Sequence, residues 1–280
     1  MKQTTNSKMF FLLCCIISTI CIVSLFVYIY KKETEHYVNL EKATEGMSAD
    51  DFNIFLINLD RNPERLDFFI QEYKNTDLKD KKFNRIPGID GKKLKIQEFV
   101  SPSAYQEIQQ IEKNGFRTKH YQLTRGAIGC YLSHMKAYDI IAAGDKDYGL
   151  IFEDDVKIDR EFLSKLNKAL PFIPNDWDIL LLSCYCITCE KKDETYYDTE
   201  RFFWLHCYLV KKESAKVINK FLKSKMIDQQ IDSELSELVI DGKIKIYCLK
   251  ENISKQTGHF GTEIQMPLKA IRGINPYTML

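Results

Sequence analysis

The sequence predicts an α/β domain with a mainly parallel central sheet, preceded by an N-terminal transmembrane helix. From residue 52 onward, short apolar runs alternate with amphipathic helical patterns, and polar or acidic residues follow several of the apolar runs. Strands and helices in alternation favour a parallel sheet joined by crossover helices. The N-terminal helix is predicted by Met9–Tyr30, a run of 22 residues without a charge.

The composition is typical of a folded protein and shows no electrostatic preference for nucleic acid. Of 280 residues, 45% are apolar and 28% are charged, and Lys+Arg 40 against Asp+Glu 39 leaves a net charge of +1. This mixture excludes disordered, collagen-like and coiled-coil proteins. A net charge so close to zero predicts no broad basic surface, so we expect no nucleic-acid partner.

The apolar run near the N-terminus is long enough to cross a bilayer. At about 1.5 Å per residue, a helix over Met9–Tyr30 reaches roughly 33 Å, against about 30 Å of hydrocarbon. A cleaved signal peptide is the alternative, but the run is long and lacks an A-x-A-like cleavage site. We therefore predict a short tail over 1–8, an anchor over 9–30, a stem over 31–51 and one large domain over 52–280. The short tail favours a single-pass protein whose large domain is lumenal (ER or Golgi) or otherwise non-cytosolic, although basic residues flank both ends of the run.

Six cysteines lie outside the anchor, an even number that suits a secretory compartment. Cys184, Cys186 and Cys189 have spacings found in zinc clusters, but no fourth ligand lies at a suitable distance in the sequence. We therefore expect thiols of strand ends and loops, some of them in disulfides, with the pairing left open. Asn252 begins an N-glycosylation sequon, which weakly favours a lumenal domain.

Five strands are predicted from short, nearly continuous apolar runs, which are typical of strands buried on both faces. They are Phe52–Leu59, Tyr148–Phe152, Trp177–Ser183, Phe202–Val210 and Ile244–Leu249. In parallel sheets, functional residues collect at the carboxyl ends of strands. Attention therefore falls on the residues that follow Leu59, Phe152 and Ser183.

Helices are predicted where apolar periodicity follows a capping residue. Asn62 and Thr124 are the expected N-caps of two helices, and Pro63 suits the first helical position. The predicted helices are Pro63 to about Lys74, Arg125 to about Ala143, a helix capped by Asp159 that ends at Leu170, Ser214–Leu222, and the acidic stretch Met226–Leu238.

Three consecutive acids, Glu153, Asp154 and Asp155, directly follow a predicted strand. In extended geometry Glu153 and Asp155 point to one side and Asp154 to the other. Two carboxylates on one side can hold Mn²⁺ or Mg²⁺ and leave coordination positions for phosphate oxygens and water. A solvated acidic turn is the alternative. His259, in a glycine-containing loop, is a candidate third metal ligand.

Two arginines lie at the opening of the first predicted helix. A helix N-terminus with Arg61 and Arg65 nearby suits an anion such as a diphosphate. Ordinary capping with surface arginines is the alternative. The sequence has no G-x-G-x-x-G or Walker loop, which disfavours dinucleotide dehydrogenases and P-loop NTPases.

The start of the helix at Arg125 carries two glycines three residues apart, Gly126 and Gly129. Small residues at these positions permit close approach of a strand or a ligand. His134 lies at the edge of the apolar stripe of this helix, where a structural hydrogen-bond donor is a better expectation than a base. Cys130 and His134 as a nucleophile pair are disfavoured, because no orienting partner accompanies them.

Taken together, these blocks resemble glycosyltransferase family 25, the family of bacterial lipooligosaccharide galactosyltransferases and animal procollagen galactosyltransferases. The resemblance extends from about Phe52 to Gln265, and Tyr185–Arg201 has no recognisable match. Its strongest blocks are Ile57–Arg65, Phe83–Gly91, Leu123–His134 and Ile151–Val156, with weaker matches at Cys207–Val210, Ile231–Asp232 and Gln256–Ile264.

This resemblance implies a GT-A-like (Rossmann-type) nucleotide-sugar-binding fold and an inverting, metal-dependent transfer. The implied donor is a UDP-sugar carrying galactose or glucose, and the acceptor is a hydroxyl of a glycan or glycoprotein. Implied roles are metal binding by Glu153 and Asp155 with Mn²⁺ or Mg²⁺, nucleotide or diphosphate contacts by Asn58, Arg61, Arg65 and Asp90 with Asp154 as a further candidate, and general-base catalysis by Asp232, with Glu234 as the second choice.

Two other functions remain open from the sequence. A catalytically inactive, transferase-like glycan-binding membrane protein would keep the fold without turnover. A metal-dependent hydrolase or phosphodiesterase would use the same carboxylates, although such enzymes usually have more His and Asp ligands than this chain offers. Metal-dependent release of UDP from a UDP-sugar, with and without acceptor, distinguishes the three.

Overall fold

The computed structural model describes residues 24, 25, 27, 28, 30, 51–119, 122–262 and 264–267. The chain divides into two compact units, residues 1–46 and 47–280. The five described residues of the first unit are helical and exposed. The rest of the predicted anchor over 9–30, and the predicted stem up to residue 50, lie outside the described residues. Within the described residues, no helix is both long and apolar enough to span a bilayer.

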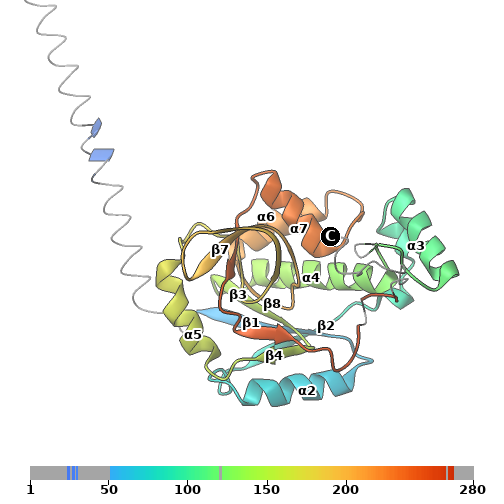
Figure 1. Ribbon diagram of the computed structural model, residues 1–280, viewed down its shortest axis with the longest axis horizontal. Coiled ribbons are helices and arrows are strands. Elements are labelled where there is room, and N and C mark those ends of the chain that lie inside the picture. Colours follow the sequence, from blue (N-terminus) through green and yellow to red (C-terminus); the bar gives the residue numbers. More distant parts are fainter. Residues whose placement is uncertain are drawn as a thin grey trace, which may run out of the picture. The chain divides into compact units, whose positions relative to one another are not determined.

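In the described part of the second unit, an eight-stranded sheet forms the centre of the domain (Figure 1), in the order β2-β1-β3-β8-β5-β9-β7-β6. Its strands are β1 Phe52–Asn58, β2 Phe83–Pro87, β3 Tyr148–Glu153, β5 Ile179–Leu181, β6 Tyr185–Lys191, β7 Tyr196–Phe203, β8 Cys207–Lys211 and β9 Ile246–Leu249. β4, Val156–Ile158, and β10, Ser254–Gln256, form a separate antiparallel pair.

The sheet is mixed, so the prediction of a mainly parallel sheet was wrong. β1 pairs in parallel with β2 and β3, and β5 with β9. β8 is antiparallel to both of its neighbours, and β7 is antiparallel to β6 and β9. The reason is the β6–β7 hairpin, which reverses the chain after β5 and returns it as β8 in the opposite direction.

The predicted strand over Phe202–Val210 is in fact the end of one strand and the whole of another. β7 ends at Phe203 and β8 begins at Cys207. Between them Trp204 has φ 76°, the one positive φ among the described residues other than glycine. The L-residue backbone rarely adopts this conformation, and it breaks the extended chain there. The apolar pattern continues through the break, which is why the sequence suggested one strand.

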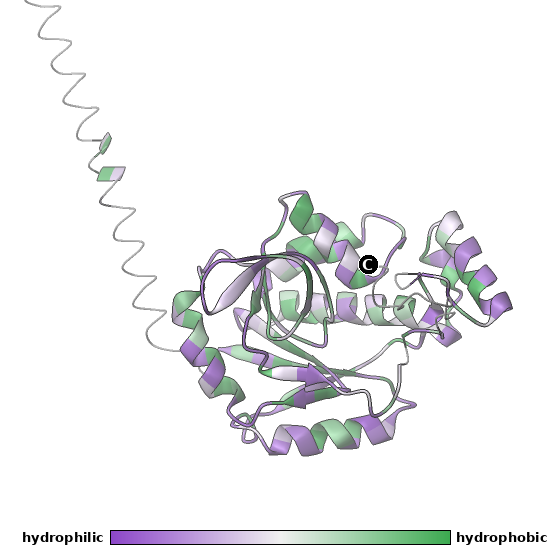
Figure 2. Ribbon diagram, viewed as in Figure 1, coloured by the Kyte–Doolittle hydropathy of each residue, from purple (hydrophilic) through white to green (hydrophobic). Residues whose placement is uncertain are grey.

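Helices cover both faces of the sheet. Side chains of β1 alternate between two apolar cores: Phe55 and Ile57 join the core that contains residues of α4, α6 and α7, while Ile54 and Leu56 join the core of α2 and α5. Two covered faces explain the nearly continuous apolar runs. Hydrophobic and hydrophilic residues alternate along α2, as expected for a helix with one buried side (Figure 2).

The helices are α2 Pro63–Lys74, α3 Pro102–Asn114, α4 Arg125–Ala143, α5 Phe162–Ala169, α6 Lys212–Leu222 and α7 Ile231–Ile240, with 3-10 turns at Gly91–Lys93, Ile96–Glu98 and Leu170–Phe172.

The predicted helix starts are confirmed at α2 and α4 and differ at the other three, since α6 begins at Lys212 rather than Ser214 and α7 at Ile231 rather than Met226. Thr124 caps α4, because its hydroxyl accepts a hydrogen bond from the backbone N–H of Ala127 at 3.1 Å. α2 begins at Pro63 as expected, although the Asn62 side chain makes no capping hydrogen bond. α5 begins at Phe162, later than predicted, since Asp159 accepts instead from the backbone N–H of Glu161 in the preceding turn.

Gly129 lets α4 pack directly against the backbone that follows β2, as the two glycines of this helix start suggested. A Cβ at Gly129 would lie 2.3 Å from the carbonyl oxygen of Ile89 and 2.7 Å from the nitrogen of Gly91. These backbone atoms cannot rotate away. We therefore expect Gly129→Ala to lower the free energy of unfolding by about 1–3 kcal/mol.

Urea denaturation of the two proteins measures this difference. Gly258→Ala is the matched control, because a Cβ there meets no atom within 4 Å and its backbone φ is not positive. We expect the control to change the free energy of unfolding by less than about 0.5 kcal/mol. Equal effects of the two substitutions would contradict the close approach.

Four of the six cysteines outside the predicted anchor form disulfides. Cys184 pairs with Cys248 and Cys186 with Cys189. The first bond ties the residue before β6 to β9, and the second lies within β6. The expectation that these cysteines do not form a zinc cluster is therefore confirmed. Cys130 and Cys207 are free thiols.

Candidate active site

The carboxyl ends of β1 and β3 meet at one edge of the sheet. The two strands are neighbours and run in parallel, with Ile57 opposite Glu153. The polar residues that follow β1 therefore lie beside the acids that follow β3. Asp154 and Asp155 form the turn between β3 and β4, and the backbone N–H of Thr257 donates to the carbonyl of Asp155 at 2.7 Å.

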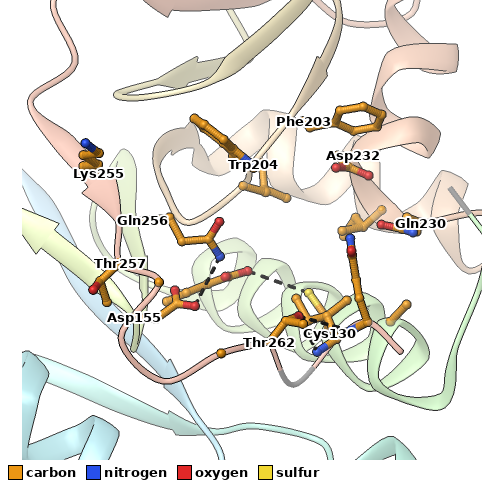
Figure 3. A pocket seen from close by; sticks show the side chains of 18 residues that line it. Cys130, Asp155, Phe203, Trp204, Gln230, Asp232, Lys255, Gln256, Thr257 and Thr262 are labelled. Carbon is orange, nitrogen blue, oxygen red and sulfur yellow. Dashed lines mark hydrogen bonds between the residues drawn. The ribbon is translucent and has the colours of Figure 1, made fainter. Parts of the chain in front are cut away.

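A cavity of about 460 Å³ opens over this edge (Figure 3). Its lining comes from five separate parts of the chain: the acids at the end of β3, the β7–β8 connection, the start of α7, the segment from β10 onward, and the first turns of α4. Glu153 and Asp155 line it from the first part, Trp204 from the second and Asp232 from the third. The two predicted metal ligands after β3 and the predicted base thus share one cavity.

A smaller cavity of about 70 Å³ adjoins the first and shares Cys130, Glu153 and Ile264 with it. All five residues predicted to contact the nucleotide or its diphosphate line this smaller cavity: Asn58, Arg61, Arg65, Asp90 and Asp154. Asp155 lines the larger cavity, Asp154 the smaller one and Glu153 both, and because Asp154 and Asp155 lie in a turn the simple alternation expected from an extended strand does not apply.

Arg65 is buried and bridges two of the acids. Its Nε lies 2.6 Å from Asp154 Oδ1, and its Nη2 lies 2.9 Å from Asp155 Oδ2. Its guanidinium carbon also lies 5.5 Å from the centre of the Phe260 ring. Burial raises the pKa of Asp154, and the charge of Arg65 opposes that rise. A surface arginine, the alternative from the sequence, is therefore excluded for Arg65.

Asn58 completes the partners of Asp154. Its Nδ2 donates to Asp154 Oδ2 at 2.7 Å, and its Oδ1 accepts from Arg85 Nε at 2.8 Å. Both oxygens of Asp154 are therefore occupied by protein groups. Arg61 is more accessible, and its Nε lies 3.0 Å from Asp90 Oδ2. Of the five residues, Arg61 and Asp90 are the ones that can turn most readily toward a ligand.

Asp155 has an oxygen that the protein leaves unsatisfied. Its Oδ2 accepts from Gln256 Nε2 at 3.2 Å and pairs with Arg65, but its buried Oδ1 has no hydrogen-bond partner among the described residues. Burial, and then the charge of Glu153, raise the pKa of Asp155 to about 7. Buried polar atoms normally have partners, so an unpaired carboxylate oxygen facing a cavity fits a cation.

Glu153 is held by a buried network from α4 and β8. Its Oε1 lies 3.0 Å from His134 Nε2 and 3.7 Å from Cys130 Sγ. His134 Nδ1 lies 2.8 Å from the Tyr208 hydroxyl, which donates to the Tyr138 hydroxyl at 3.1 Å. Burial alone would raise the pKa of Glu153, but the hydrogen bond and charge of His134 hold it below the ordinary value. His134 therefore acts as a structural partner, as predicted.

The ligand atoms of Cys130, His134 and Glu153 lie within 4.8 Å of one another, which is close enough for a metal ion. Burial raises the pKa of the Cys130 thiol well above its usual range, so the thiol is protonated. Since a thiolate is the form that attacks carbon, this raised pKa disfavours Cys130 as a nucleophile. The oxygen ligands of Asp155 and Glu153 suit a hard cation better.

Asp232 lies at the start of α7, with its carboxylate at the larger cavity. The backbone N–H of Ser233 donates to it at 2.9 Å, and the backbone N–H of Trp204 also stabilises its charge. Burial, followed by the charge of Glu153, nevertheless raises the pKa of Asp232 to about 6. A carboxylate of this pKa is ionised at neutral pH and basic enough to accept a proton.

Sequence comparison supports the resemblance deduced from these blocks. The model of "Glycosyltransferase family 25 (LPS biosynthesis protein)" matches residues 51–233. The chain belongs to glycosyltransferase family 25. The match includes the acids after β3, the residues after β1 and Asp232.

Curated relatives of this family 25 chain include enzymes and one protein named as inactive. "Procollagen galactosyltransferase 2" of Homo sapiens is 24% identical over 70% of this chain and 32% of its own length. A "Glycosyltransferase 25 family member" of Aedes aegypti is 24% identical over 82% of this chain and 35% of its own. "Inactive glycosyltransferase 25 family member 3" of Homo sapiens is 30% identical over 25% of this chain and 12% of its own. The chain spans between about a fifth and a third of the length of the first curated relatives it matches.

Two predicted site residues of the family 25 domain lie outside both cavities. Glu234 is fully buried, and its carboxylate pairs with Lys225 Nζ at 2.5 Å and accepts from Gln229 Nε2 at 3.2 Å. His259 is exposed, its backbone N–H donates to Thr257 Oγ1 at 3.2 Å, and its ring packs edge-on against Phe260. The position of neither side chain supports the role predicted for it.

Other residues of the site were not predicted to belong to it, although Gln256 and Thr257 lie in one of the weaker family blocks. Gln256 and Thr257 line the larger cavity because β10 pairs with β4 next to the acids. Trp204 lines it because the chain turns sharply between β7 and β8. His206 is buried in the same connection, where burial lowers its pKa to about 4, and its carbonyl accepts from the backbone N–H of Glu153. Each of these positions depends on contacts between distant segments.

Proposed function

We propose that this family 25 protein is an inverting hexosyltransferase with a GT-A-like nucleotide-sugar-binding domain. It transfers galactose or glucose from a UDP-sugar to a hydroxyl of a glycan or glycoprotein. One observation carries the proposal: the residues assigned to the donor and the carboxylate assigned as base line two adjoining cavities that share Glu153. A donor and an acceptor can thus meet beside the acids that follow β3.

Asp155 and Glu153 are the residues that would hold Mn²⁺ or Mg²⁺. The unpaired Oδ1 of Asp155 supports this assignment, since a bound cation would satisfy it. When bound, the cation would neutralise charge on the departing diphosphate. Arg65 stabilises the ionised forms of Asp154 and Asp155 side by side, and Arg61, which pairs with Asp90 at the smaller cavity, would contact the diphosphate itself.

Asp232 would accept the proton of the attacking hydroxyl. Its carboxylate lies in the larger cavity, away from the arginines that line the smaller one. The backbone N–H groups of Ser233 and Trp204 hold it in one orientation, which a general base requires.

We expect the transfer rate to rise with pH through about 6 and to level off above about 7, because Asp232 must be deprotonated to act as the base. The measurement is kcat/KM for the acceptor between about pH 5 and pH 8 at saturating Mn²⁺. Asp232→Asn should lose this acidic limb. If the residual activity of the variant keeps the same limb, another group is responsible for it.

The decisive test of the proposed function is release of UDP from a panel of UDP-sugars with Mn²⁺, with and without saccharide acceptors. Release that requires the metal and increases with an acceptor supports transfer. If no donor releases UDP, the alternative of a catalytically inactive protein is favoured. One relative is named as an inactive member of the family. Equal release with and without acceptor would favour a hydrolase.

We also propose that the protein is a single-pass membrane protein with its domain in the ER or Golgi lumen. The uncharged run over Met9–Tyr30 and the two disulfides support this arrangement, since disulfides persist in oxidising compartments. Protease protection of the domain in sealed microsomes tests it.

A further inference from the structure

We infer that Trp204, supported by Tyr185, is a stacking platform for the sugar ring of a saccharide acceptor. The inference rests on the proposed function and adds to it the class of acceptor and the residues that select it. Trp204 lines the larger cavity and is 43% exposed, so its ring is accessible to a ligand there. Tyr185, 42% exposed, packs against it with ring centres 5.4 Å apart.

The backbone at Trp204 places this ring next to the proposed base. A φ of 76° is strained for any residue with a Cβ, and such strain persists where the surrounding structure maintains it. Here the same turn directs the Trp204 N–H to the carboxylate of Asp232. Figure 3 shows Trp204 and Asp232 on the same side of the cavity. An acceptor ring on the indole would therefore lie beside the base.

The polar lining around the platform suits a sugar. Gln230, Gln256, Thr257 and Thr262 contribute amide and hydroxyl groups to the same cavity. A pyranose has apolar C–H faces and a rim of hydroxyl groups, so it requires an aromatic surface together with neutral hydrogen-bonding groups. A nucleobase also stacks on aromatic rings, but the arginines suited to its diphosphate line the smaller cavity, to which Trp204 does not contribute.

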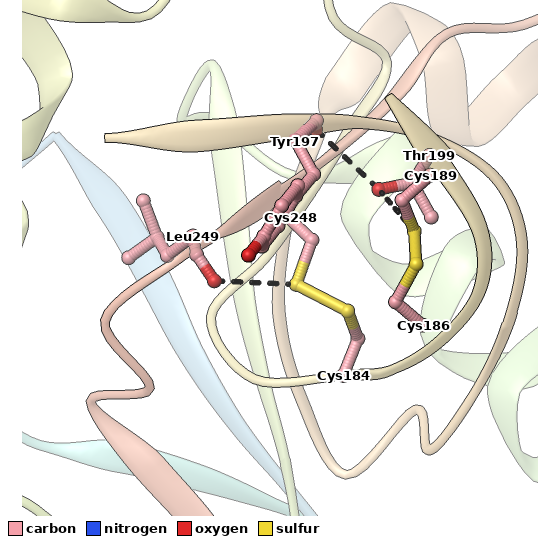
Figure 4. Close-up of a disulfide and its surroundings, with 7 residues drawn as sticks. All are labelled: Cys184, Cys186, Cys189, Tyr197, Thr199, Cys248 and Leu249. Carbon is pink, nitrogen blue, oxygen red and sulfur yellow. Dashed lines mark hydrogen bonds between the residues drawn. A yellow bond between two sulfur atoms is a disulfide. The ribbon is translucent and has the colours of Figure 1, made fainter. Parts of the chain in front are cut away.

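Tyr185, which supports the platform, is itself tied to the sheet. Tyr185 follows Cys184 directly, and the Cys184–Cys248 disulfide ties that residue to β9 (Figure 4). Tyr185 also stacks with Phe203, with ring centres 6.5 Å apart. Tyr185 is the first residue of the stretch Tyr185–Arg201, in which the sequence shows no recognisable family block. The sequence alone therefore did not identify the acceptor. A rigid aromatic surface loses little conformational entropy when a sugar binds.

The chain has two tryptophans, which makes the platform directly observable. The other tryptophan, Trp177, is buried, with 3% of its surface exposed. The substitution Trp177→Phe leaves Trp204 as the source of tryptophan fluorescence in the full-length protein. In this test, the protein saturated with UDP and Mn²⁺ is to be titrated with methyl glycosides of galactose, glucose, N-acetylglucosamine and xylose. At least one glycoside that increases UDP release should change the fluorescence saturably and protect it from acrylamide.

Kinetics provide the second measurement. Trp204→Leu should raise KM for that glycoside at least about tenfold, the loss expected for one aromatic stacking contact, and Trp204→Phe should restore most of it. The affinity for UDP should not change. Phe172→Leu is the control, because Phe172 is an exposed aromatic residue outside both cavities, and it should behave as the unsubstituted protein.

Three results would overturn the platform. The first is UDP release that increases with a glycoside without any change in Trp204 fluorescence. The second is an unchanged KM in Trp204→Leu. The third is a fluorescence response to peptide acceptors and to none of the glycosides. Each leaves the proposed transferase intact, whereas failure of the transferase appears separately as no UDP release with any donor.

Discussion

We expect Asp155→Asn to abolish the effect of Mn²⁺ on UDP binding and to slow transfer by at least about 100-fold, the loss that follows when charge stabilisation at the leaving group is removed. The substitution keeps the shape of the side chain and an oxygen for the Arg65 contact. It replaces one carboxylate oxygen by an N–H₂ group, which cannot bind a cation. In the wild type, the oxygen available to the cation is the buried Oδ1 that has no partner among the described residues.

Isothermal titration with UDP, with and without Mn²⁺, measures the effect. Asp241→Asn is the control, because Asp241 is an exposed acid on the loop after α7 that pairs with Lys243. It should retain the full effect of Mn²⁺. Mn²⁺-dependent UDP binding that survives in Asp155→Asn would remove Asp155 from the metal site.

Thermal denaturation separates this result from unfolding. The folded-state pKa of Asp155, about 7, is raised above the ordinary value of a carboxyl group. Its ionisation therefore costs stability, and this cost grows as pH rises from about 4 to about 7. Without metal, Asp155→Asn should be at least as stable as the wild type at neutral pH. Mn²⁺ should raise Tm of the wild type and leave Tm of the variant unchanged.

We expect Asp232→Asn to slow transfer by about 10²–10⁴-fold, the range of general-base catalysis, and to leave the affinity for UDP unchanged. The asparagine oxygen can still accept from the backbone N–H groups that hold the aspartate. What is lost is the capacity to take a proton from the acceptor hydroxyl. Single-turnover transfer and UDP titration measure the two quantities separately.

Glu234→Gln is the matched comparison, since Glu234 lies two residues further along the same helix. Its carboxylate pairs with Lys225 and lies outside the lining of the cavity. We expect this variant to be less stable, because Lys225 loses its charged partner, but to transfer at nearly the wild-type rate. Slower transfer in Glu234→Gln than in Asp232→Asn would exchange the two assignments.

The sequence could not distinguish the roles of Asp232 and Glu234. Both are acids of one predicted helix, and nothing in the local pattern separates their roles. Two residues along an α-helix correspond to a rotation of about 200°, so their side chains leave on nearly opposite sides. Only the packing of α7 against its neighbours decides which of them reaches the cavity.

The direction of β8 shows the same limit for the fold. Its run of buried apolar residues has the pattern of a strand covered on both faces, which the sequence associated with a parallel sheet. The β6–β7 hairpin, which the sequence did not predict, reverses the chain before β8. The apolar pattern indicates that both faces of the strand are buried, and a strand buried on both faces can run in either direction in the sheet.

What the sequence determined by itself is local. The strand before the three acids, the start of α2 at Pro63, the cap of α4 at Thr124 and the blocks that identify family 25 all depend on residues close together in the chain. Tertiary structure alone decided that Asp155, Trp204 and Asp232 line one cavity. The physical reason is that these three come from different elements, and their meeting depends on strand order, strand direction and helix rotation, which nearby residues do not specify.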